Sequence, residues 1–433
     1  MSIVKLFPFI LVGITSINSP HLYSGTYYVV VIDAGSTGSR VHAYKFSLPR
    51  SRLKRDSVRK LRFEDELYVA RKPGLSSYAS NPKKGAESII ELIQKADSFV
   101  PKHMRAKTPL IVRATAGLRA LPEAVSANLL MQIRVAIANL GYKINDNSVN
   151  ILQGKDEGIN MWYTVNLLTD TLEQTNPMSS LEMGGASAQV TFVLHPGEIS
   201  NYLSKDVYVR PAVTNRTLFS RSYLGQGISA ARLGTLQLEA GNIKTKKFIS
   251  VCADPVLTKF EENFFGEKVE ISGVSREGYS IKEVYLRCRK FVTAYIKATM
   301  GNVLQLKGLR KIAAMGYYYQ FANDEGLIPR DKNGHVTIQN LLAHAVSPTG
   351  GCATHDKQNP WRCFDAIFIV TLLQYGYGID KNSIIHLYDT IDNYNVEWTL
   401  GVAYNYVMAE ITTNPDLIHV HHYLRKILSK MRK

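Results

Sequence analysis

Two segments of the sequence repeat one pattern, and this repetition constrains the fold more than any other feature. In the first, the apolar run 27–32 predicts a buried strand that ends in Asp33 and the Gly/Ser-rich turn 34–40. In the second, Glu182 stands before the similar turn 183–189. A short strand is predicted after each turn, and the two carboxylates lie about 150 residues apart, the length of one ordinary domain. The pattern predicts an internal duplication, in which two α/β domains each present a glycine-rich hairpin to a shared cleft.

Turns of this kind can bind phosphate. Glycine lets the backbone adopt positive φ and approach a ligand closely, so that successive N–H groups can hold phosphate oxygens. Ser36, Thr37, Ser39 and Ser187 add hydroxyl donors, and the carboxylate beside each turn can hold a hydrated Mg²⁺ or Ca²⁺ that bridges the phosphates. Neither turn is a P-loop, because no G-x-x-x-x-G-K-[ST] occurs and a strand rather than a helix follows. For one turn alone, an ordinary Gly/Ser hairpin remains the alternative.

Between the two turns, two strand–turn–helix units are predicted. The strand 110–113 is followed by the turn 114–119 and a helix at 122–140, and the strand 150–153 is followed by a turn and a helix that contains Glu157. In α/β folds this arrangement places functional groups at the carboxyl ends of strands. Alone, Glu157 is an ordinary first-turn glutamate stabilised by the helix dipole. Beside phosphate-binding turns it becomes a candidate base for activating water.

The N-terminus indicates the compartment. Lys5 is followed by a short apolar run at 6–17 and then by polar residues at 18–26, which are the parts of a signal peptide. The run is too short to span a bilayer, which takes about 20 residues, and no later stretch is long and apolar enough to do so. A buried strand or helix of the mature fold is the alternative. The sequence therefore predicts a mature chain without a membrane span, in the secretory lumen or outside the cell.

Four cysteines and one sequon fit a secretory compartment. Cys252, Cys288, Cys352 and Cys363 form an even count without metal-type C-x-x-C spacing. Two disulfides can connect four cysteines in three ways; sequential pairing, Cys252–Cys288 and Cys352–Cys363, is the simplest, and the sequence alone does not choose. Free buried thiols are the alternative. Asn215 begins the sequon Asn-Arg-Thr, a glycosylation site if the chain is secretory.

The chain is basic, with 52 Lys and Arg against 36 Asp and Glu. The basic residues form clusters only at 50–62 and 425–433, and neither cluster has the interleaved aromatic side chains of a single-strand binder. We interpret the excess as solvated surface charge and expect no nucleic-acid partner. Three consecutive tyrosines, Tyr317, Tyr318 and Tyr319, follow a short apolar strand and could either stack on a nucleobase or pack as part of a strand.

These constellations resemble the motifs of the E-type apyrases, the nucleoside triphosphate diphosphohydrolase family. The resemblance runs from about residue 27 to 406 in the family's order, through VIDAGSTGSRVH at 31–42, ATAGLR at 114–119, DEGINMWYTVN at 156–166, EMGGASAQ at 182–189, and CFDAI at 363–367 with EWTLG at 397–401. Further segments at 73–79, 107–109 and 222–233 resemble the soluble, lumenal branch. That branch carries two disulfides at similar spacings, and its members are nucleoside diphosphatases that favour UDP and GDP.

The resemblance implies an α/β fold of the actin and hexokinase superfamily, in which two ribonuclease-H-like domains enclose an interdomain active-site cleft. It divides the chain into a signal peptide at 1–24, a first lobe at 25–150 completed by 398–433, and a second lobe at 151–397. The last helix, after Trp398, would close the first lobe.

The resemblance also implies a role for each matching residue. Glu157 would be the general base, and Ser187 and Gln189 would orient the attacking water. The remaining roles are cation contact through water (Asp33, Thr115 and Glu182), phosphate binding (Ser36, Thr37, Gly38, Ser39, Gly184, Gly185 and Ala186) and nucleobase binding (Tyr317, Tyr318 and Tyr319).

The implied activity is hydrolysis of the terminal phosphate of nucleoside diphosphates, with triphosphates as further candidate substrates, by direct attack of water. The expected cofactor is Ca²⁺ or Mg²⁺, with Mn²⁺ as a third candidate, and the expected state is a monomer or weak oligomer in the ER or Golgi lumen or outside the cell. Glu182 departs from the family, whose members usually carry Asp there. A catalytically weakened nucleotide-binding relative is therefore one alternative; a sugar kinase of the same superfamily and a lumenal binding module switched by nucleotide are two others.

Overall fold

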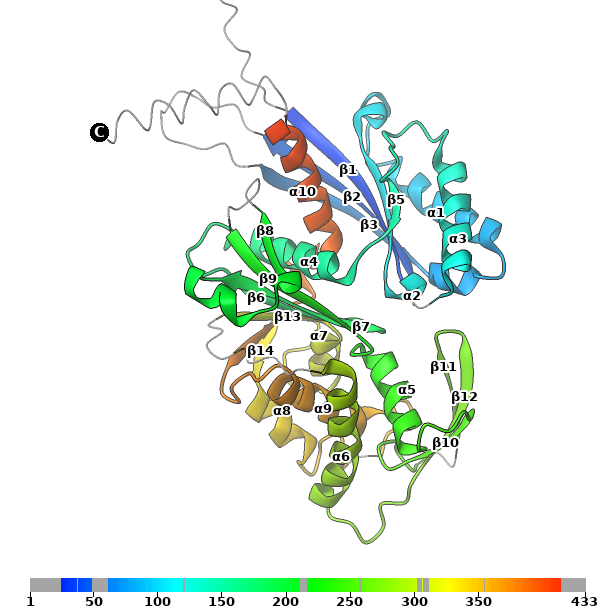
Figure 1. The fold of residues 1–433 in the computed structure, drawn as a ribbon, viewed down its shortest axis with the longest axis vertical. Coiled ribbons are helices and arrows are strands. Elements are labelled where there is room, and N and C mark those ends of the chain that lie inside the picture. The colour runs from blue at the N-terminus through cyan, green and yellow to red at the C-terminus, as the bar shows by residue number, and fades with distance from the viewer. Residues whose placement is uncertain are drawn as a thin grey trace, which may run out of the picture.

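The computed structural model describes residues 25–413 except for 37, 49–60, 120, 211–215, 257–258, 302–305, 307–310 and 354. Two central sheets, each flanked by helices, organise these residues into a first and a second lobe, upper and lower in Figure 1. Within the described ranges, no helix combines the length and the apolar character needed to cross a membrane. Several sequence-based predictions lie outside the described residues: the signal peptide, Thr37, Asn215, the cluster 425–433 and most of the cluster 50–62.

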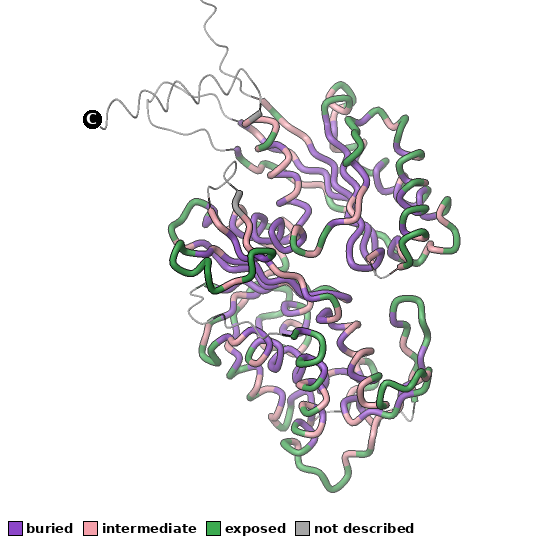
Figure 2. The backbone as a smooth tube through the Cα atoms, in the orientation of Figure 1, coloured by how far each residue is buried: buried purple, intermediate pink, exposed green. Residues whose placement is uncertain are grey.

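The first sheet contains, in spatial order, β3 (Arg62–Arg71), β2 (Ser39–Leu48), β1 (Gly25–Ala34), β4 (Leu110–Ala114) and β5 (Val149–Ile151). A tight hairpin makes β2 antiparallel to β1, whereas β4, which follows a helical crossover, is parallel to it. The crossover helix α1 (Pro82–Ala96) packs against α3 (Glu123–Ile137), and both bury apolar side chains against one face of the sheet. The strands are therefore mostly buried, and the outer faces of these helices are exposed (Figure 2).

The second sheet contains, in spatial order, β14 (Gly334–Thr337), β15 (Ile384–Leu387), β13 (Ile312–Gly316), β6 (Ser179–Met183), β7 (Ser187–Leu194), β9 (Arg216–Leu224) and β8 (Val207–Arg210). Its outer helices are α5 (Ile228–Glu239), α6 (Ile281–Met300), α7 (Tyr317–Asp324), α8 (Ile338–Ala345) and α9 (Arg362–Thr371). Side chains of sheet and helices form one large apolar core. At the start of α6, Ser280 and Glu283 form a capping box, which explains where this long helix begins.

Smaller elements complete the second lobe. A three-stranded sheet of β10 (Lys247–Ser250), β12 (Glu267–Gly273) and β11 (Phe260–Phe264) lies beside α5, and the short hairpin β16 (Thr390–Ile391) and β17 (Tyr394–Asn395) precedes the last helix. Short helical turns occur at η1 (Leu75–Tyr78), η2 (Lys102–Lys107), η3 (Pro196–Asn201), η4 (Ser204–Asp206) and η5 (Leu372–Gly376).

The two sheets share one connectivity, and the predicted duplication is thereby confirmed. The strands β3-β2-β1-β4-β5 correspond in order and direction to β9-β7-β6-β13-β15. The registers of the two hairpins correspond as well, because Asp33 pairs with Arg40 and Glu182 pairs with Gln189. The repeated sequence pattern is thus one hairpin used at the same place in each sheet.

The helix that follows each set of strands packs on the other lobe's sheet. α4 (Gly154–Leu168) follows β5 and packs on β6, β7 and β9, whereas α10 (Trp398–Thr413) comes after β15 and packs on β1 and β2. The two helices cross and contact each other between the sheets (Figure 1). Their apolar side chains join those of both sheets in one shared core, which ties the lobes together.

The crossing of α4 and α10 is close at Gly401. A Cβ atom there would lie 2.0 Å from the carbonyl oxygen of Asn160, so the approach requires glycine. Thr164 of α4 fixes the same crossing, since its Oγ1 donates to the carbonyl of Glu397 (2.8 Å) and accepts from the N–H of Gly401 (2.9 Å). The crossing therefore fixes the position of Glu397, the residue before α10, relative to α4.

Two local expectations differ from the structure. The three tyrosines are not part of a strand: β13 ends at Gly316, whose φ is 67°, and Tyr317 begins α7. The turn 114–119 contains a short helix, α2 (Ala116–Arg119), that the sequence pattern did not indicate. Both differences arise at the carboxyl end of a strand, where a helix of four residues (α2) or eight residues (α7) begins.

Sequential pairing of the cysteines is confirmed. Cys252–Cys288 ties the segment after β10 to α6, and Cys352–Cys363 ties a loop to α9. All four side chains are buried in the second lobe. The disulfides therefore brace the outer layer of that lobe.

We expect loss of the Cys252–Cys288 bridge to destabilise the protein more than loss of Cys352–Cys363. The bridges close sequence separations of 36 and 11 residues, for which the loop-entropy model gives about 4 and about 3 kcal/mol of stabilisation. Scanning calorimetry of the two paired Cys→Ser variants measures the difference, with peptide mapping of the unreduced wild type as the control. A larger fall in the unfolding temperature for the shorter loop would contradict this ranking.

Candidate active site

The turns of the two hairpins are closed in the same way. In the first turn, the N–H of Gly35 donates to the carbonyl of Gly38 at 3.0 Å. In the second, the N–H of Gly184 donates to the carbonyl of Ser187, also at 3.0 Å. The hairpins thus present two loops of matching backbone geometry, one from each lobe.

Each turn is also supported from behind by the backbone of a neighbouring segment. The N–H of Leu75 donates to the first turn at 3.2 Å, and the N–H of Ile228 donates to the second at 3.0 Å. Gly227 packs so tightly beneath the second turn that a Cβ there would lie within 2.5 Å of the backbone of 185–187. A side chain at Gly227 would therefore displace the turn that is predicted to bind phosphate.

Asp33 lies at the end of β1 and is almost fully buried. Its Oδ2 accepts from Arg40 Nη1 at 2.9 Å, whereas no described residue donates to its Oδ1. Burial raises the pKa of Asp33 to about 7, although Arg40 opposes this shift. One oxygen of this carboxylate is thus held in place, and the other is a buried acceptor without a donor among the described residues.

Glu157 lies in the first turn of α4 and is held by two donors. Arg119 Nη2 donates to its Oε2 at 3.0 Å, and Gln189 Nε2 approaches the same oxygen at 3.3 Å. Burial raises the pKa of Glu157, and the Arg119 guanidinium opposes this shift. A carboxylate whose pKa is raised above its usual range is a stronger base, which suits the role that the sequence predicts for it.

Ser187 connects Glu157 with the second hairpin. Its Oγ accepts from Gln189 Nε2 at 2.9 Å and from Arg119 Nη2 at 3.3 Å. A serine hydroxyl has two acceptor positions and one hydrogen, so the hydrogen of Ser187 is left to donate to a further group. Gln189 Nε2 is also 3.1 Å from Ser222 Oγ, so its two hydrogens are shared among Ser187, Ser222 and Glu157. The predicted trio of Glu157, Ser187 and Gln189 therefore forms one hydrogen-bonded group.

Glu182 lies at the end of β6, in the place that Asp33 has in β1. Its Oε2 is buried, and no described residue donates to that atom. Burial raises the pKa of Glu182 well above the usual value, and the charges of Glu157, Glu397 and Asp33 raise it further. The predicted carboxylates of the two hairpins therefore lie within electrostatic reach of each other and of Glu157.

The site fits a divalent cation bound through water. Among the described residues, no group of three or more His, Cys, Asp and Glu side chains could hold an ion by itself. Asp33 and Glu182, however, each carry a buried carboxylate oxygen that lacks a described donor, and buried anions of this kind call for a cation or ordered water. Carboxylates and water are also the ligands that Mg²⁺ and Ca²⁺ prefer.

The other predicted phosphate and cation residues surround the first turn. Thr115 is buried between β4 and α2, and its N–H donates to the carbonyl of Ala34 at 3.4 Å, next to Asp33. Ser39, which pairs with Ala34 in the hairpin, has a buried hydroxyl without a described partner. Ser36 lies partly exposed in the turn itself. These residues are brought together with Asp33.

The three tyrosines lie beside the second hairpin, but two of them point into the protein. Gly316, directly before them, pairs with Met183 of β6. Tyr318 and Tyr319 are only 3% and 9% exposed and belong to the core of the second lobe. The hydroxyl of Tyr317 donates to Asp365 Oδ2 at 2.7 Å. The start of α7 is therefore near the second hairpin. The rings of Tyr318 and Tyr319 pack in the core, and the hydroxyl of Tyr317 is hydrogen-bonded.

Four residues of the site were given no role from the sequence: Arg40, His42, Arg119 and Glu397. Both arginines stand inside the quoted motifs, and a cation next to a predicted phosphate turn is a signal that could have identified them. Glu397 is different, because it comes from a segment far along the chain and reaches the first hairpin only through the packing of α10. Arg119 links the lobes, since it extends from α2 to Glu157 and Ser187.

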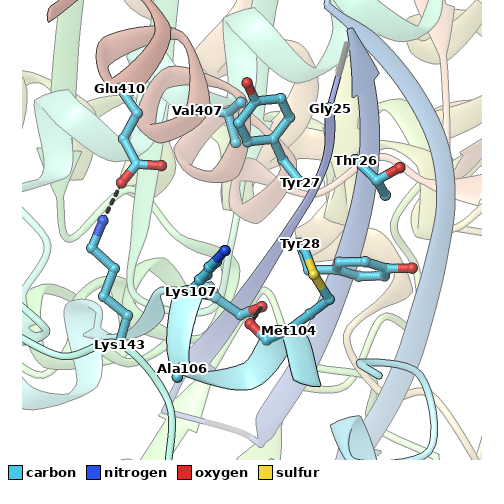
Figure 3. A pocket seen from close by; sticks show the side chains of 11 residues that line it. Gly25, Thr26, Tyr27, Tyr28, Met104, Ala106, Lys107, Lys143, Val407 and Glu410 are labelled. Atoms are coloured by element: carbon cyan, nitrogen blue, oxygen red, sulfur yellow. Dashed lines mark hydrogen bonds and ion pairs between the residues drawn. The ribbon is translucent and has the colours of Figure 1, made fainter. Parts of the chain in front are cut away.

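A cavity of about 470 Å³ lies elsewhere, where β1 begins. Its lining includes Tyr28, Met104 and the ion pair between Lys143 and Glu410 (Figure 3). It contains none of the predicted site residues. The chemistry described above is therefore not located in this cavity.

Comparison with known proteins identifies the family of this chain. The profile of the GDA1/CD39 (nucleoside phosphatase) family matches residues 22–420. The chain is 32% identical to ectonucleoside triphosphate diphosphohydrolase 5 of Gallus gallus, over 88% of this chain and 87% of that protein. It is 30% identical to the human nucleoside diphosphate phosphatase ENTPD5, over 88% of each, and 30% identical to the mouse ectonucleoside triphosphate diphosphohydrolase 6, over 88% of this chain and 82% of the relative.

A solved structure shows the same fold. The crystal structure of nucleoside triphosphate hydrolases from Neospora caninum aligns with a TM-score of 0.63 and 15% identity, over 90% of this chain and 93% of that one. The predicted α/β fold of two duplicated domains is confirmed. Profile, relatives and fold lead to one conclusion: this chain belongs to the GDA1/CD39 (nucleoside phosphatase) family.

Proposed function

We propose that this protein hydrolyses the terminal phosphate of nucleoside diphosphates, with UDP and GDP as the expected substrates and triphosphates as further candidates. The name of the human relative, nucleoside diphosphate phosphatase, supports the diphosphate preference. The observation that carries the proposal is the position of Glu157, a buried carboxylate that is hydrogen-bonded to the same arginine as Ser187 and lies within electrostatic reach of Asp33 and Glu182.

In this proposal, Glu157 takes a proton from a water molecule as the water attacks the terminal phosphorus. Arg119 and Gln189 hold the carboxylate in one orientation, and the free hydrogen of the Ser187 hydroxyl is available to the same water. A base fixed in this way raises the population of productive geometries, which is a large part of enzymatic rate enhancement. Transfer to water is direct, so the mechanism needs no covalent intermediate on the protein.

The two turns would bind the phosphates between them. From the first lobe, the backbone N–H groups of 36–39 and the hydroxyls of Ser36, Thr37 and Ser39 would bind phosphate oxygens. From the second lobe, the N–H groups of Gly184, Gly185 and Ala186 would do the same. Donors fixed in advance stabilise the charge on the transferring phosphoryl group without reorganisation during the reaction. Because one turn comes from each lobe, closing the lobes around the nucleotide would assemble the site.

A divalent cation, Ca²⁺, Mg²⁺ or Mn²⁺, would be held through water by Asp33, Glu182 and Thr115. When bound, such an ion neutralises phosphate charge and stabilises the leaving oxygen. The protein's own contribution is to keep two acceptor oxygens, Asp33 Oδ1 and Glu182 Oε2, free of described donors.

The nucleobase would bind beside the start of α7. Of the three tyrosines, Tyr317 is the best candidate for direct contact, because it is the most exposed of them and its hydroxyl is fixed by Asp365. Arg232 donates to both that hydroxyl and Asp365, which orients the ring. Tyr318 and Tyr319 would support this wall from the core rather than contact the base.

We also propose the secretory lumen of the ER or Golgi, or the cell exterior, as the location. Two disulfides are typical of oxidising compartments. We propose that the protein acts as a monomer or weak oligomer.

A phosphate-release panel tests the proposal as a whole. UDP, GDP, ADP and their triphosphates would each be assayed with Ca²⁺, Mg²⁺ or Mn²⁺ and with EDTA. We expect release from diphosphates that EDTA abolishes. Release that requires a sugar acceptor would instead indicate a kinase.

Glu157→Gln should abolish hydrolysis while nucleotide binding survives. Glutamine keeps the size of the side chain and can still interact with Arg119, but it cannot accept the proton, and a positioned base contributes about 10²–10⁴-fold. The measurements are turnover and calorimetric binding of a diphosphate. Near-normal turnover would mean that another group activates the water.

Glu182→Asp should raise Mg²⁺-supported turnover relative to Ca²⁺ or Mn²⁺. Glutamate carries its carboxylate one carbon–carbon bond further from the backbone than aspartate, about 1.5 Å, and Mg²⁺ tolerates less variation in geometry than Ca²⁺. The assay compares wild type and variant with each metal at saturating nucleotide. If the ratio of Mg²⁺-supported to Ca²⁺- or Mn²⁺-supported turnover is the same in wild type and variant, this prediction is wrong. A wild type that binds nucleotide but hydrolyses nothing with any metal would identify a catalytically weakened relative.

A further inference from the structure

A continuous chain of charged side chains lies beneath the first hairpin. Glu66 Oε1 lies 2.6 Å from His42 Nδ1, and His42 Nε2 lies 3.5 Å from Glu397 Oε2. The other oxygen of Glu397 is 3.6 Å from Arg40 Nε, and Arg40 Nη1 donates to Asp33 Oδ2 at 2.9 Å. The chain therefore alternates between anion and cation and ends on the carboxylate of the predicted cation site.

Three distant parts of the sequence supply this chain. Arg40 and His42 are alternate residues of β2 and so point to the same face of the sheet. Glu66 comes from the neighbouring strand β3, and Glu397 comes from the residue before α10. Thr164 of α4 donates to the backbone of Glu397 at 2.8 Å. Glu397 is thus attached by its backbone to the helix that carries the general base, and by its side chain to the partner of Asp33.

The charges in the chain stabilise each other, although His42, Glu66 and Asp33 are buried and Arg40 and Glu397 are largely shielded. His42 is 0% exposed, and its ring stacks on Tyr44 and lies against Tyr68. Burial opposes its charged form, but Glu397 and Glu66 raise the pKa of His42 to about 9, so the imidazolium form is favoured at neutral pH. Burial likewise opposes the charge on Glu397, yet His42 and Arg40 lower its pKa.

A second cluster also places a glutamate between a histidine and an arginine, but it lies away from the predicted site. In the second lobe, Glu325 accepts from Arg362 Nε at 2.6 Å and lies 2.6 Å from His344 Nε2. That cluster joins α7, α8 and α9 and contains no predicted site residue. The cluster around Glu397 differs because its last member is Asp33.

We propose that Glu397 and Arg40 are positioning residues for the hydrolysis: Glu397, backed by His42, fixes the Arg40 guanidinium, which in turn fixes the orientation of the Asp33 carboxylate. The proposal rests on the function proposed above, since it assigns a role to Asp33 within that reaction. It also gives the crossing of α4 and α10 a role, because the same crossing positions Glu157 and Glu397.

The kinetic test compares Glu397→Gln with Glu325→Gln. Both variants replace a carboxylate that lies between a histidine and an arginine by a neutral side chain of the same shape. We expect Glu397→Gln to lower kcat about tenfold, which is about 1.4 kcal/mol, and to leave the nucleotide KM nearly unchanged. Glu325→Gln should lower the unfolding temperature without changing kcat. If both variants behave alike, Glu397 is only structural and the proposal is wrong.

Arg40→Lys provides a second variant should Glu397→Gln fail to fold. Lysine keeps the positive charge, but it cannot contact Asp33 and Glu397 through one planar group. We expect the same loss of kcat as for Glu397→Gln. The double variant should be no worse than either single one, because both remove the same contact. Multiplicative losses, or full activity of Arg40→Lys, would overturn the proposal.

Cation binding provides a readout that does not depend on turnover. Free Mn²⁺ can be followed by electron paramagnetic resonance in the presence of the non-hydrolysable α,β-imido analogue of UDP. We expect Glu397→Gln to weaken Mn²⁺ binding about tenfold, again about 1.4 kcal/mol, and Glu325→Gln to leave it unchanged. If the wild type hydrolyses no nucleotide but this difference in binding is found, the proposed function fails and the positioning role stands. Equal Mn²⁺ affinity in all three proteins would refute the positioning role.

Discussion

The contact between α4 and α10 determines how the two halves of the site face each other. Each helix packs on one sheet, and the two meet where Gly401 allows the backbone of Asn160 to approach. Thr164 then fixes the start of α10 by two hydrogen bonds. Arg119 of α2 adds a second link between the lobes through Glu157 and Ser187. The geometry of the site is therefore a property of the helix crossing as much as of the turns that would bind the nucleotide.

Electrostatics distinguishes the carboxylates that this geometry brings together. Burial raises the pKa of Asp33, Glu157 and Glu182, whereas Glu397 alone has its pKa lowered, because His42 and Arg40 lie on either side of it. Asp33 and Glu157 each have one arginine partner, and Glu182 has no ion pair among the described residues. The protein thus places carboxylates whose ionised form it does not fully compensate around the proposed cation site, where a bound cation would favour that form. Glu397, in contrast, is compensated by the protein's own side chains.

Much of this arrangement could be predicted from local sequence, and the rest could not for a physical reason. The two hairpins were predictable because a carboxylate followed by a glycine-rich turn is a contiguous pattern, and the register that pairs Asp33 with Arg40 follows from it. Glu397 stands in the motif at 397–401, but its contact with the first hairpin arises from tertiary packing, which the local pattern does not show. The tyrosines show that a contiguous pattern can also mislead. Three tyrosines in a row left strand packing as an alternative, but β13 ends at Gly316, whose φ is 67°, and Tyr317 begins a helix.

The way in which α10 covers the first sheet has a consequence for synthesis of the chain. β1 begins at Gly25 and is among the first segments to leave the ribosome, but the helix that covers its inner face ends only at Thr413. Protein synthesis proceeds at about 5–20 residues per second, so the apolar face of the first sheet stays uncovered by α10 for roughly 20–80 s. The first lobe therefore cannot complete its core before α10 has been synthesised, and its folding depends on keeping that face from aggregating until then. A duplicated fold with exchanged helices gains a shared core between its lobes, and that core is complete only when α10 has been made.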